Sequence, residues 1–119
     1  MRFDPELIYG IYRLEKIDSF KDGFQTNEKA NDGMFVFTRE QKLSVVSGSN
    51  DWVMAYTGDF KVSEGSVIIK IKSCVVREME ETTIQRRIIK LDERELVLDA
   101  SGSEKTKRTQ ISWTKIKSL

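Results

Sequence analysis

The side chains of this sequence best suited to binding a small molecule include a glutamine and an arginine on one predicted strand. Residues 84–91 alternate in a way that is typical of a β-strand. The phase that turns Ile89 and Leu91 inward also turns Gln85 and Arg87 inward. A guanidinium is planar, stays charged and offers forked donors, so it suits a carboxylate or enolate. The pattern predicts that Gln85 or Arg87 anchors the polar end of a ligand.

Two alternatives to this role stay open. Arg87 could instead pair with an internal acid or lie at a rim, because burying an unpaired charge is costly. The opposite strand phase would make Arg86 the inward residue in its place.

Aromatic residues could line the same site, namely Tyr12, Tyr56, Phe60 and Trp113. Tyrosine hydroxyls can position a polar ligand group against an otherwise apolar wall. The alternative is core packing, because inward aromatic residues are how a small β-barrel fills itself. Tyr12 and Trp113 fit that alternative best.

The residues that most familiar enzymes use are scarce. There is no histidine, which removes Ser-His-Asp and Cys-His arrangements and the usual histidine metal sites. Cys74 is the one cysteine, so no intramolecular disulfide and no paired-cysteine site can form. The run Glu78, Glu80 and Glu81 is typical of a solvated connection. The sequence predicts no catalytic residue, metal or cofactor, and leaves open whether the protein is an enzyme.

The charges give no sign of a nucleic-acid partner. Twenty basic and nineteen acidic residues leave a net charge of +1, which attracts no polyanion over long range. Lys105, Lys107 and Arg108 form a basic tip that Lys115 and Lys117 extend, but no aromatic residues are interleaved with them.

Short alternating runs separated by turn residues predict about eight strands. They lie near residues 9–19, 34–38, 43–47, 56–62, 67–74, 84–91, 96–100 and 111–113. Asp4-Pro5-Glu6 predicts a helix or turn of one or two turns at the start. The polar stretch Phe20–Asp32 is predicted to be one long loop, and Phe20 and Phe24 could either cap a cavity or pin that loop down.

Hairpin succession without crossover helices excludes a parallel sheet. A flat sheet of eight strands would expose two edges and an apolar face, and closure removes both problems. We therefore expect an all-β fold: a closed or nearly closed antiparallel up-and-down barrel formed by residues 1–119 as a single domain. Its interior would suit side chains and at most one small ligand.

Several segments resemble the bacterial lipocalin-like domain family. They are GIYRL, GMFVFT with KLSVV, AYTGDFKV with VIIKI, IQRRIIKLDERELVL and ISWTK, in that order along nearly the whole chain. The family usually carries Gly-x-Trp in its first strand, and here Tyr12 stands after Gly10 in the tryptophan position. The resemblance implies an eight-stranded barrel with a cavity and a helix or turn closing one end. It leaves function open, because such barrels range from ligand carriers to a few isomerases and cyclases.

Three functions follow from these observations. The first is binding of a small, mostly apolar and possibly acidic ligand, and the second is a metal-free isomerase or cyclase. The third is a structural or oligomerisation domain with a filled core, whose outward apolar residues pair with a second subunit; those residues are Ile68, Cys74, Ile84 and Ile88. We expect a monomer, or a homodimer through outer strand faces.

The sequence contains no apolar stretch of membrane-spanning or signal-peptide length. We therefore expect a cytoplasmic protein.

Overall fold

Antiparallel strands follow one another along almost the whole chain. The structure is a computed structural model that describes residues 3–21, 24–27, 32–48, 53–100 and 107–119. Its strands are β1 (Gly10–Lys21), β2 (Phe24–Asn27), β3 (Asp32–Phe37), β4 (Lys42–Gly48), β5 (Val53–Ser63), β6 (Ser66–Cys74), β7 (Thr83–Leu91), β8 (Glu95–Asp99) and β9 (Lys107–Ser118). Within those ranges the only helical segments are the 3-10 helices η1 (Pro5–Ile8) and η2 (Arg77–Met79).

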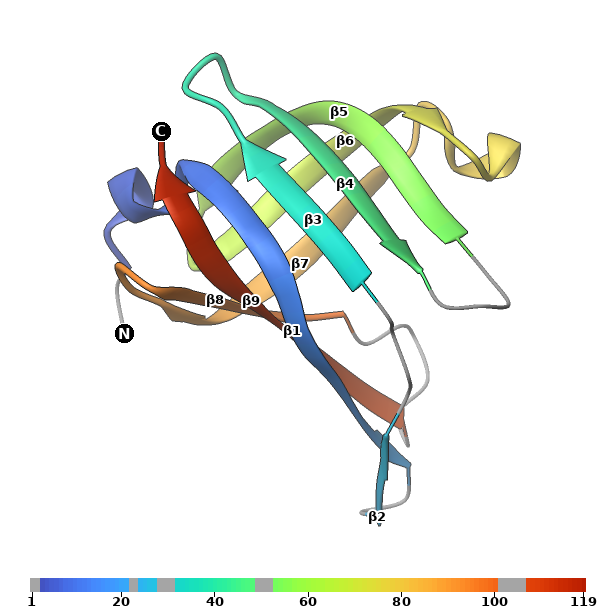
Figure 1. Ribbon diagram of the computed structural model, residues 1–119. Helices are drawn as coiled ribbons and strands as arrows, with labels where there is room; N and C mark the ends of the chain where they lie inside the picture. The colour runs from blue at the N-terminus through green and yellow to red at the C-terminus, as the bar shows by residue number, and fades with distance from the viewer. Residues whose placement is uncertain (1–2, 22–23, 28–31, 49–52, 101–106) are drawn as a thin grey trace.

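Hydrogen bonding between β1 and β9 closes the sheet into a barrel. Strands β1, β3, β4, β5, β6, β7, β8 and β9 follow in that order, and β9 pairs back onto β1. The closing pairs run from Gly10 opposite Ser118 to Lys21 opposite Lys107, and Figure 1 shows the two strands side by side. The predicted eight-stranded up-and-down barrel is confirmed.

Strand β2 is an addition that the sequence did not predict. It pairs with residues 18–21 of β1, so part of the stretch Phe20–Asp32 is a hairpin and not a loop. Phe20 itself lies in β1 and is half-buried. The side chain of Phe24 and residues 28–31 lie outside the described part of the chain, and so does the predicted capping role of Phe24.

The predicted N-terminal turn is confirmed as η1. The Asp4 carboxylate accepts a hydrogen bond from the Glu6 amide at 3.0 Å, which satisfies one of the free N–H groups at the start of the turn. Pro5 occupies the first helical position. Ile8 at the other end of η1 is completely buried, so η1 fills one end of the barrel.

A layer of aromatic rings occupies the barrel interior. Phe35 stacks on Phe37 with centroids 4.2 Å apart, and Trp113 meets Phe35 edge-on at 5.1 Å. Phe60 and Tyr12 both meet Phe37 edge-on. Buried aliphatic side chains complete this core: Ile8, Leu43, Val45, Val67, Ile69, Ile71, Ile88, Leu91, Leu96 and Leu98.

Register shifts between strands change which residues face the interior, as two of them illustrate. One lies in β1 between Leu14 and Lys16, and beyond it Ile17 is buried although the alternation of the sequence placed it on the outer side. The other lies in β7 between Ile88 and Lys90, so that Ile88 and Leu91, three positions apart, are both buried. A bulge inserts one residue and so reverses the alternation that follows it.

The two ends of the barrel differ. Because strands run alternately up and down, the turns β3–β4, β5–β6 and β7–β8 lie at the end that holds η1, here called the η1 end. The connection that contains η2 lies at the opposite end, here called the η2 end (Figure 1).

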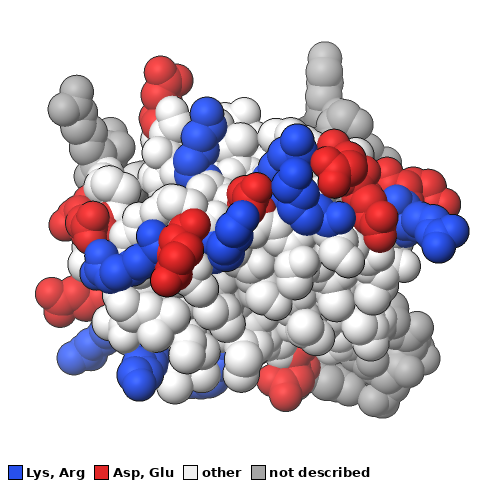
Figure 2. Space-filling model, turned by 90° about the horizontal axis from the view of Figure 1, so that it is seen from above, with Lys and Arg blue, Asp and Glu red and all other residues white. Residues whose placement is uncertain are grey.

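The charged side chains of the outer surface are mixed in sign. Figure 2 shows Lys and Arg interspersed with Asp and Glu on the face seen from above. Exposed pairs such as Lys42 with Asp59, and Lys90 with Glu95, join opposite charges on the surface. No helix in the described ranges is long and apolar enough to cross a membrane.

Candidate functional site: the barrel interior towards the η2 end

Tyr12 and Phe60, two of the predicted ligand-binding residues, lie in the packed aromatic layer. The Tyr12 hydroxyl lies 3.1 Å from the Leu7 carbonyl oxygen and 2.9 Å from that of Ile8. Burial raises the pKa of Tyr12 well above its usual value. Because the hydroxyl is already bonded to η1, Tyr12 holds η1 against the barrel. The packing alternative describes Tyr12 and Phe60 better than the ligand role does.

The inward phase predicted for Gln85 and Arg87 is wrong. Both side chains are exposed. Arg87 lies 3.4 Å from the carboxylate of Asp99 on β8, and the Gln85 amide donates to the Ser66 hydroxyl on β6 at 3.2 Å. The prediction took Ile89 and Leu91 as one face, but the register shift after Ile88 separates their phases.

Arg86 takes the inward position, as the alternative phase would have it. It shares its strand face with Ile84, which packs against the core, and with the buried Ile88. On β6 it is opposite Val67, which is completely buried. In the part of the chain that the structure describes, the Arg86 guanidinium has no carboxylate partner within ion-pair distance.

Tyr56 projects into the interior from β5. It packs against the core and lies opposite Cys74 of β6 in the sheet register. Burial raises the pKa of Tyr56 to about 12, while the charge of Arg86 acts in the opposite direction. No described residue accepts a hydrogen bond from this hydroxyl.

Trp113 supplies a second inward-facing donor without a partner. The side chain is 3% exposed, and its Nε1 is buried with no hydrogen-bond partner among the residues described. A buried N–H without an acceptor is costly and is rare in folded proteins.

The third functional alternative placed outward apolar residues on β6 and β7, and this is largely wrong. Ile88 is buried inside the barrel, and Ile84 and Cys74 pack against the core. Of that group, Ile68 stays on the outer side, next to Lys61 and Lys70.

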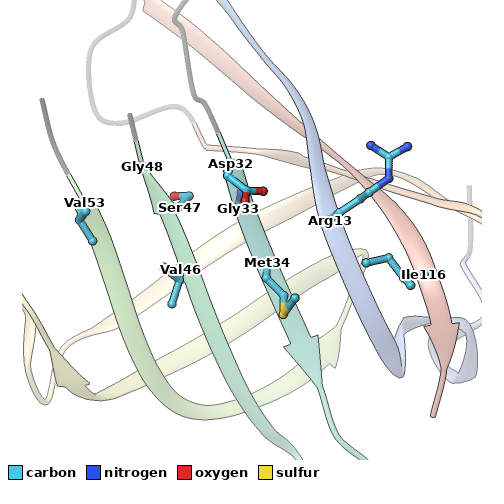
Figure 3. A pocket seen from close by; sticks show the side chains of 9 residues that line it. All are labelled: Arg13, Asp32, Gly33, Met34, Val46, Ser47, Gly48, Val53 and Ile116. Carbon is cyan, nitrogen blue, oxygen red and sulfur yellow. The ribbon is translucent and has the colours of Figure 1, made fainter. Parts of the chain in front are cut away.

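The structure shows an apolar surface that the sequence analysis missed. A hollow of about 510 Å³ lies on the outer side of the barrel and crosses β5, β4, β3, β1 and β9 (Figure 3). Its apolar members are Met34, Val46, Val53 and Ile116. The runs MFVF and VV, apolar at successive positions, are the signal that could have found it, because such strands bury both faces.

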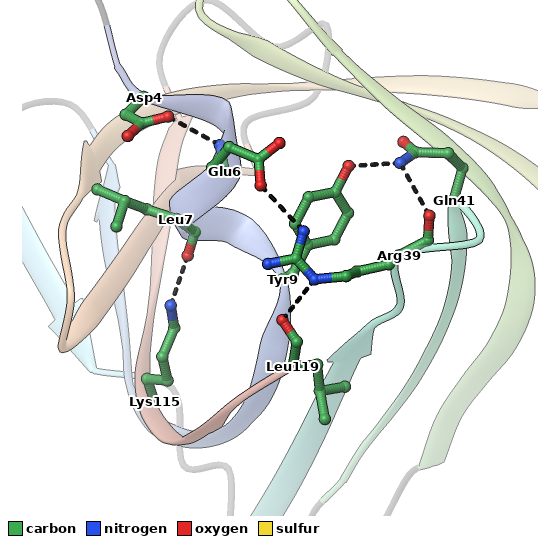
Figure 4. Close-up of polar contacts among 8 residues, drawn as sticks. All are labelled: Asp4, Glu6, Leu7, Tyr9, Arg39, Gln41, Lys115 and Leu119. Atoms are coloured by element: carbon green, nitrogen blue, oxygen red, sulfur yellow. Dashed lines mark hydrogen bonds and ion pairs between the residues drawn. The ribbon is translucent and has the colours of Figure 1, made fainter.

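The η1 end is held together by polar contacts between distant segments (Figure 4). Arg39 in the β3–β4 turn donates to the Leu119 main-chain oxygen at 2.9 Å and lies 3.0 Å from the Glu6 carboxylate. Lys115 donates to the Leu7 carbonyl oxygen at 2.5 Å, and burial lowers the pKa of Lys115. These contacts and the aromatic layer fill the η1 end.

No three Cys, Asp or Glu side chains in the described ranges gather closely enough to hold a metal ion.

The barrel is similar to two solved structures. One is a lipocalin-like protein from Bacteroides uniformis, with a TM-score of 0.61 and 12% sequence identity, covering 92% of this chain and 99% of that one. The other is an uncharacterized protein from Bacteroides eggerthii, with a TM-score of 0.56 and 12% identity, covering 90% of this chain and 98% of that one. No family model and no curated protein matches the sequence. The likeness shows that the chain has the lipocalin-like fold.

Proposed function

We propose that this protein binds a small, mostly apolar molecule with one acidic or hydrogen-bond-accepting group inside the barrel, between the aromatic layer and the η2 end. The observation that carries the proposal is the buried Nε1 of Trp113, which has no partner in the described part of the chain. A ligand oxygen would satisfy that donor and remove the cost of leaving it unbonded.

Arg86 and Tyr56 support an acidic group on that ligand. A carboxylate would give the inward guanidinium the partner that an inward cation requires. Tyr56 remains protonated at neutral pH because its pKa is about 12, so its hydroxyl is available as a donor. In the proposed site these three donors would face an apolar wall, which is the composition usual for small-molecule pockets.

The same Tyr56 is poorly suited to act as a general base. A general base works best when its pKa is near the working pH, and a tyrosine with a pKa of about 12 stays in its acid form. The arrangement therefore favours holding a ligand over removing a proton from it.

Binding can be tested with the anionic fluorophore 8-anilinonaphthalene-1-sulfonate, with decanoate and decanol as competitors. We expect saturable binding, with decanoate displacing the probe at lower concentration than decanol does. Arg86→Gln should weaken decanoate competition by about tenfold, the effect of losing one charge-assisted hydrogen bond. Arg87→Gln is the matched control, because the same change on the outer side should shift affinity by less than about twofold.

A second readout reports on Trp113 itself. In a Trp52→Phe background the emission comes from Trp113 alone, since the chain has two tryptophans. Decanoate should shift that emission at the concentrations that displace the probe. Absence of saturable binding, or equal effects of Arg86→Gln and Arg87→Gln, would overturn the proposal.

A further inference from the structure

The large apolar side chains that are half or more exposed gather on one side of the barrel. Among the described residues they are Met34 at 50%, Val46 at 50%, Val53 at 62%, Val75 at 60% and Ile116 at 57%. Four of them line the outer hollow shown in Figure 3. We call this surface the apolar face.

The sheet register makes the apolar face continuous. Met34 on β3 pairs with Val46 on β4, and Val46 pairs with Ala55 on β5. The Val75 amide donates to the Ala55 carbonyl oxygen at 3.0 Å, which extends the row beyond β6. Directly paired residues of antiparallel strands project to the same side, so this row is one outward surface. Five side chains exposed to this degree present an apolar area on the order of several hundred Å². Apolar patches of that size on monomeric proteins are often interaction sites.

Two charges at this surface have opposite signs. Arg13 on β1 is paired with Met34, and Asp32 lies two positions from Met34 on β3, so that both border the hollow. The Asp32 carboxylate accepts one hydrogen bond from the Gly33 amide at 2.8 Å. Arg13 lies 3.0 Å from Glu15 through one guanidinium nitrogen, which leaves other donors of its five available.

We propose that a second copy of this chain covers the apolar face in a two-fold symmetric dimer. A two-fold axis near Met34 would bring Arg13 of each copy to Asp32 of the other, and the apolar rows would pack face to face. A symmetric dimer uses the same patch twice, so a patch with one cation and one anion is complementary to itself. A surface that binds anionic lipid usually carries a cationic rim. The apolar face carries one cation and one anion instead, which favours a second copy of the chain over a membrane.

The first test is the mass of the protein in solution over a concentration series from about 1 to about 500 µM, a range suited to an interface at the small end of specific contacts. Sedimentation equilibrium should show a monomer and dimer in exchange. Val46→Glu should raise the dissociation constant by at least about tenfold, because it buries a charge without a partner. Ile68→Glu is the matched control: it also adds a glutamate on the outer side, but away from the apolar face, and should leave the constant within about twofold. Circular dichroism should show that both variants fold.

The second test examines the proposed charge pairing. Arg13→Glu and Asp32→Lys should each weaken the dimer, because each places like charges opposite one another, while the double variant should recover most of the affinity. A monomer at every concentration would overturn the proposal. So would a dimer that Val46→Glu leaves intact, a double variant weaker than both single ones, or a monomer that binds phosphatidylcholine vesicles through this face.

Discussion

Buried polar groups of this barrel differ in whether they have hydrogen-bond partners. The Tyr12 hydroxyl has two carbonyl oxygens within hydrogen-bond distance, and the Ser19 hydroxyl lies 3.4 Å from that of Thr109. The Nε1 of Trp113 has no acceptor among the described residues. A protein that only needed a stable core would gain by satisfying or replacing that donor.

Tyr56 should make stability depend on pH under alkaline conditions. The pKa of its hydroxyl is about 12 in the folded protein and about 10 in an unfolded chain. Its contribution is therefore fully present below about pH 10 and is lost as the pH rises towards 12, because only the unfolded chain releases its proton readily in that window. The unfolding free energy of the parent protein should fall between pH 9 and about 11.5. That of Tyr56→Phe should fall less over the same range, by on the order of 1–2 kcal/mol.

Urea unfolding at several pH values measures this difference. Tyr9→Phe serves as the control, since the Tyr9 hydroxyl bonds to the Gln41 side chain on the surface. Parallel alkaline curves for the parent and Tyr56→Phe would contradict the assignment of a buried, protonated Tyr56.

The sequence predicted that Tyr12, Phe60 and Trp113 face the interior, but it named neither Phe35 nor Phe37 and it turned the wrong arginine inward. Strand β7 carries an isoleucine in both phases, Ile88 in one and Ile89 in the other, so only Leu91 favoured the phase of Arg87 over that of Arg86. The deciding feature is the register shift after Ile88. It depends on pairing with β8, a contact between strands that a pattern within one strand does not contain.

At the scale of elements, irregular strand pairing shapes the barrel as much as regular pairing does. Strands β5 and β6 shift register between Thr57 and Gly58. A Cβ at Gly58 would lie 2.0 Å from the Lys70 carbonyl oxygen, so the backbones approach more closely there than any side chain allows. At the β5–β6 turn, Glu64 and Gly65 both have positive φ, as in the tight turns that suit hairpin twist.

Replacing these two glycines by alanine should have different effects. Gly58→Ala must push β5 and β6 apart and should lower the unfolding free energy by at least about 2–3 kcal/mol. Gly65→Ala meets no atom within 4 Å but keeps a φ of +76°, so it should cost only about 1 kcal/mol. Denaturant midpoints of the two variants provide the comparison, and equal losses would show that the close approach to Lys70 is relieved without cost.

Strand positions were largely predictable because each strand has turn residues on both sides. The turn Ser63-Glu64-Gly65-Ser66 is where the sequence placed it. Strand β2 was missed because the polar run Phe20–Asp32 carries no alternation of its own. Its pairing depends on β1 continuing past Ser19, where β9 supports it on the other side.

At the scale of the whole molecule, the η1 end of the barrel is filled, while Trp113 and Tyr56 are inward donors without a described hydrogen-bond partner. The filled end brings together η1, the β3–β4 turn and the last residues of β9 through Tyr12, Arg39 and Lys115. Closure was predictable from the number of strands and the cost of exposed edges, whereas the filling of the interior was left open. The apolar face was not predictable, because whether a strand's second apolar side meets a core or solvent depends on the complete arrangement of strands.

Tyr12→Phe tests how far the filled end stabilises the whole fold. Removing the hydroxyl leaves the Leu7 and Ile8 carbonyl oxygens without this donor and should lower the unfolding free energy by about 1–2 kcal/mol. Tyr9→Phe removes a hydroxyl from the exposed side of the same end and should change it by less than about 0.5 kcal/mol. Urea unfolding monitored by circular dichroism measures both, and a Tyr12→Phe protein as stable as the parent would mean that Ile8 and the contacts of Lys115 and Arg39 hold η1 without the Tyr12 hydroxyl.

The pairing of β1 with β9 has a consequence for the folding of the chain. It joins Gly10 to Ser118, so the ring closes only when residues near opposite ends of the sequence meet, and contacts of such long separation form slowly. Until they form, any partly assembled sheet carries two unpaired edges, the surfaces through which β-proteins aggregate. The rate at which β1 and β9 pair therefore determines how long the folding chain exposes these two edges.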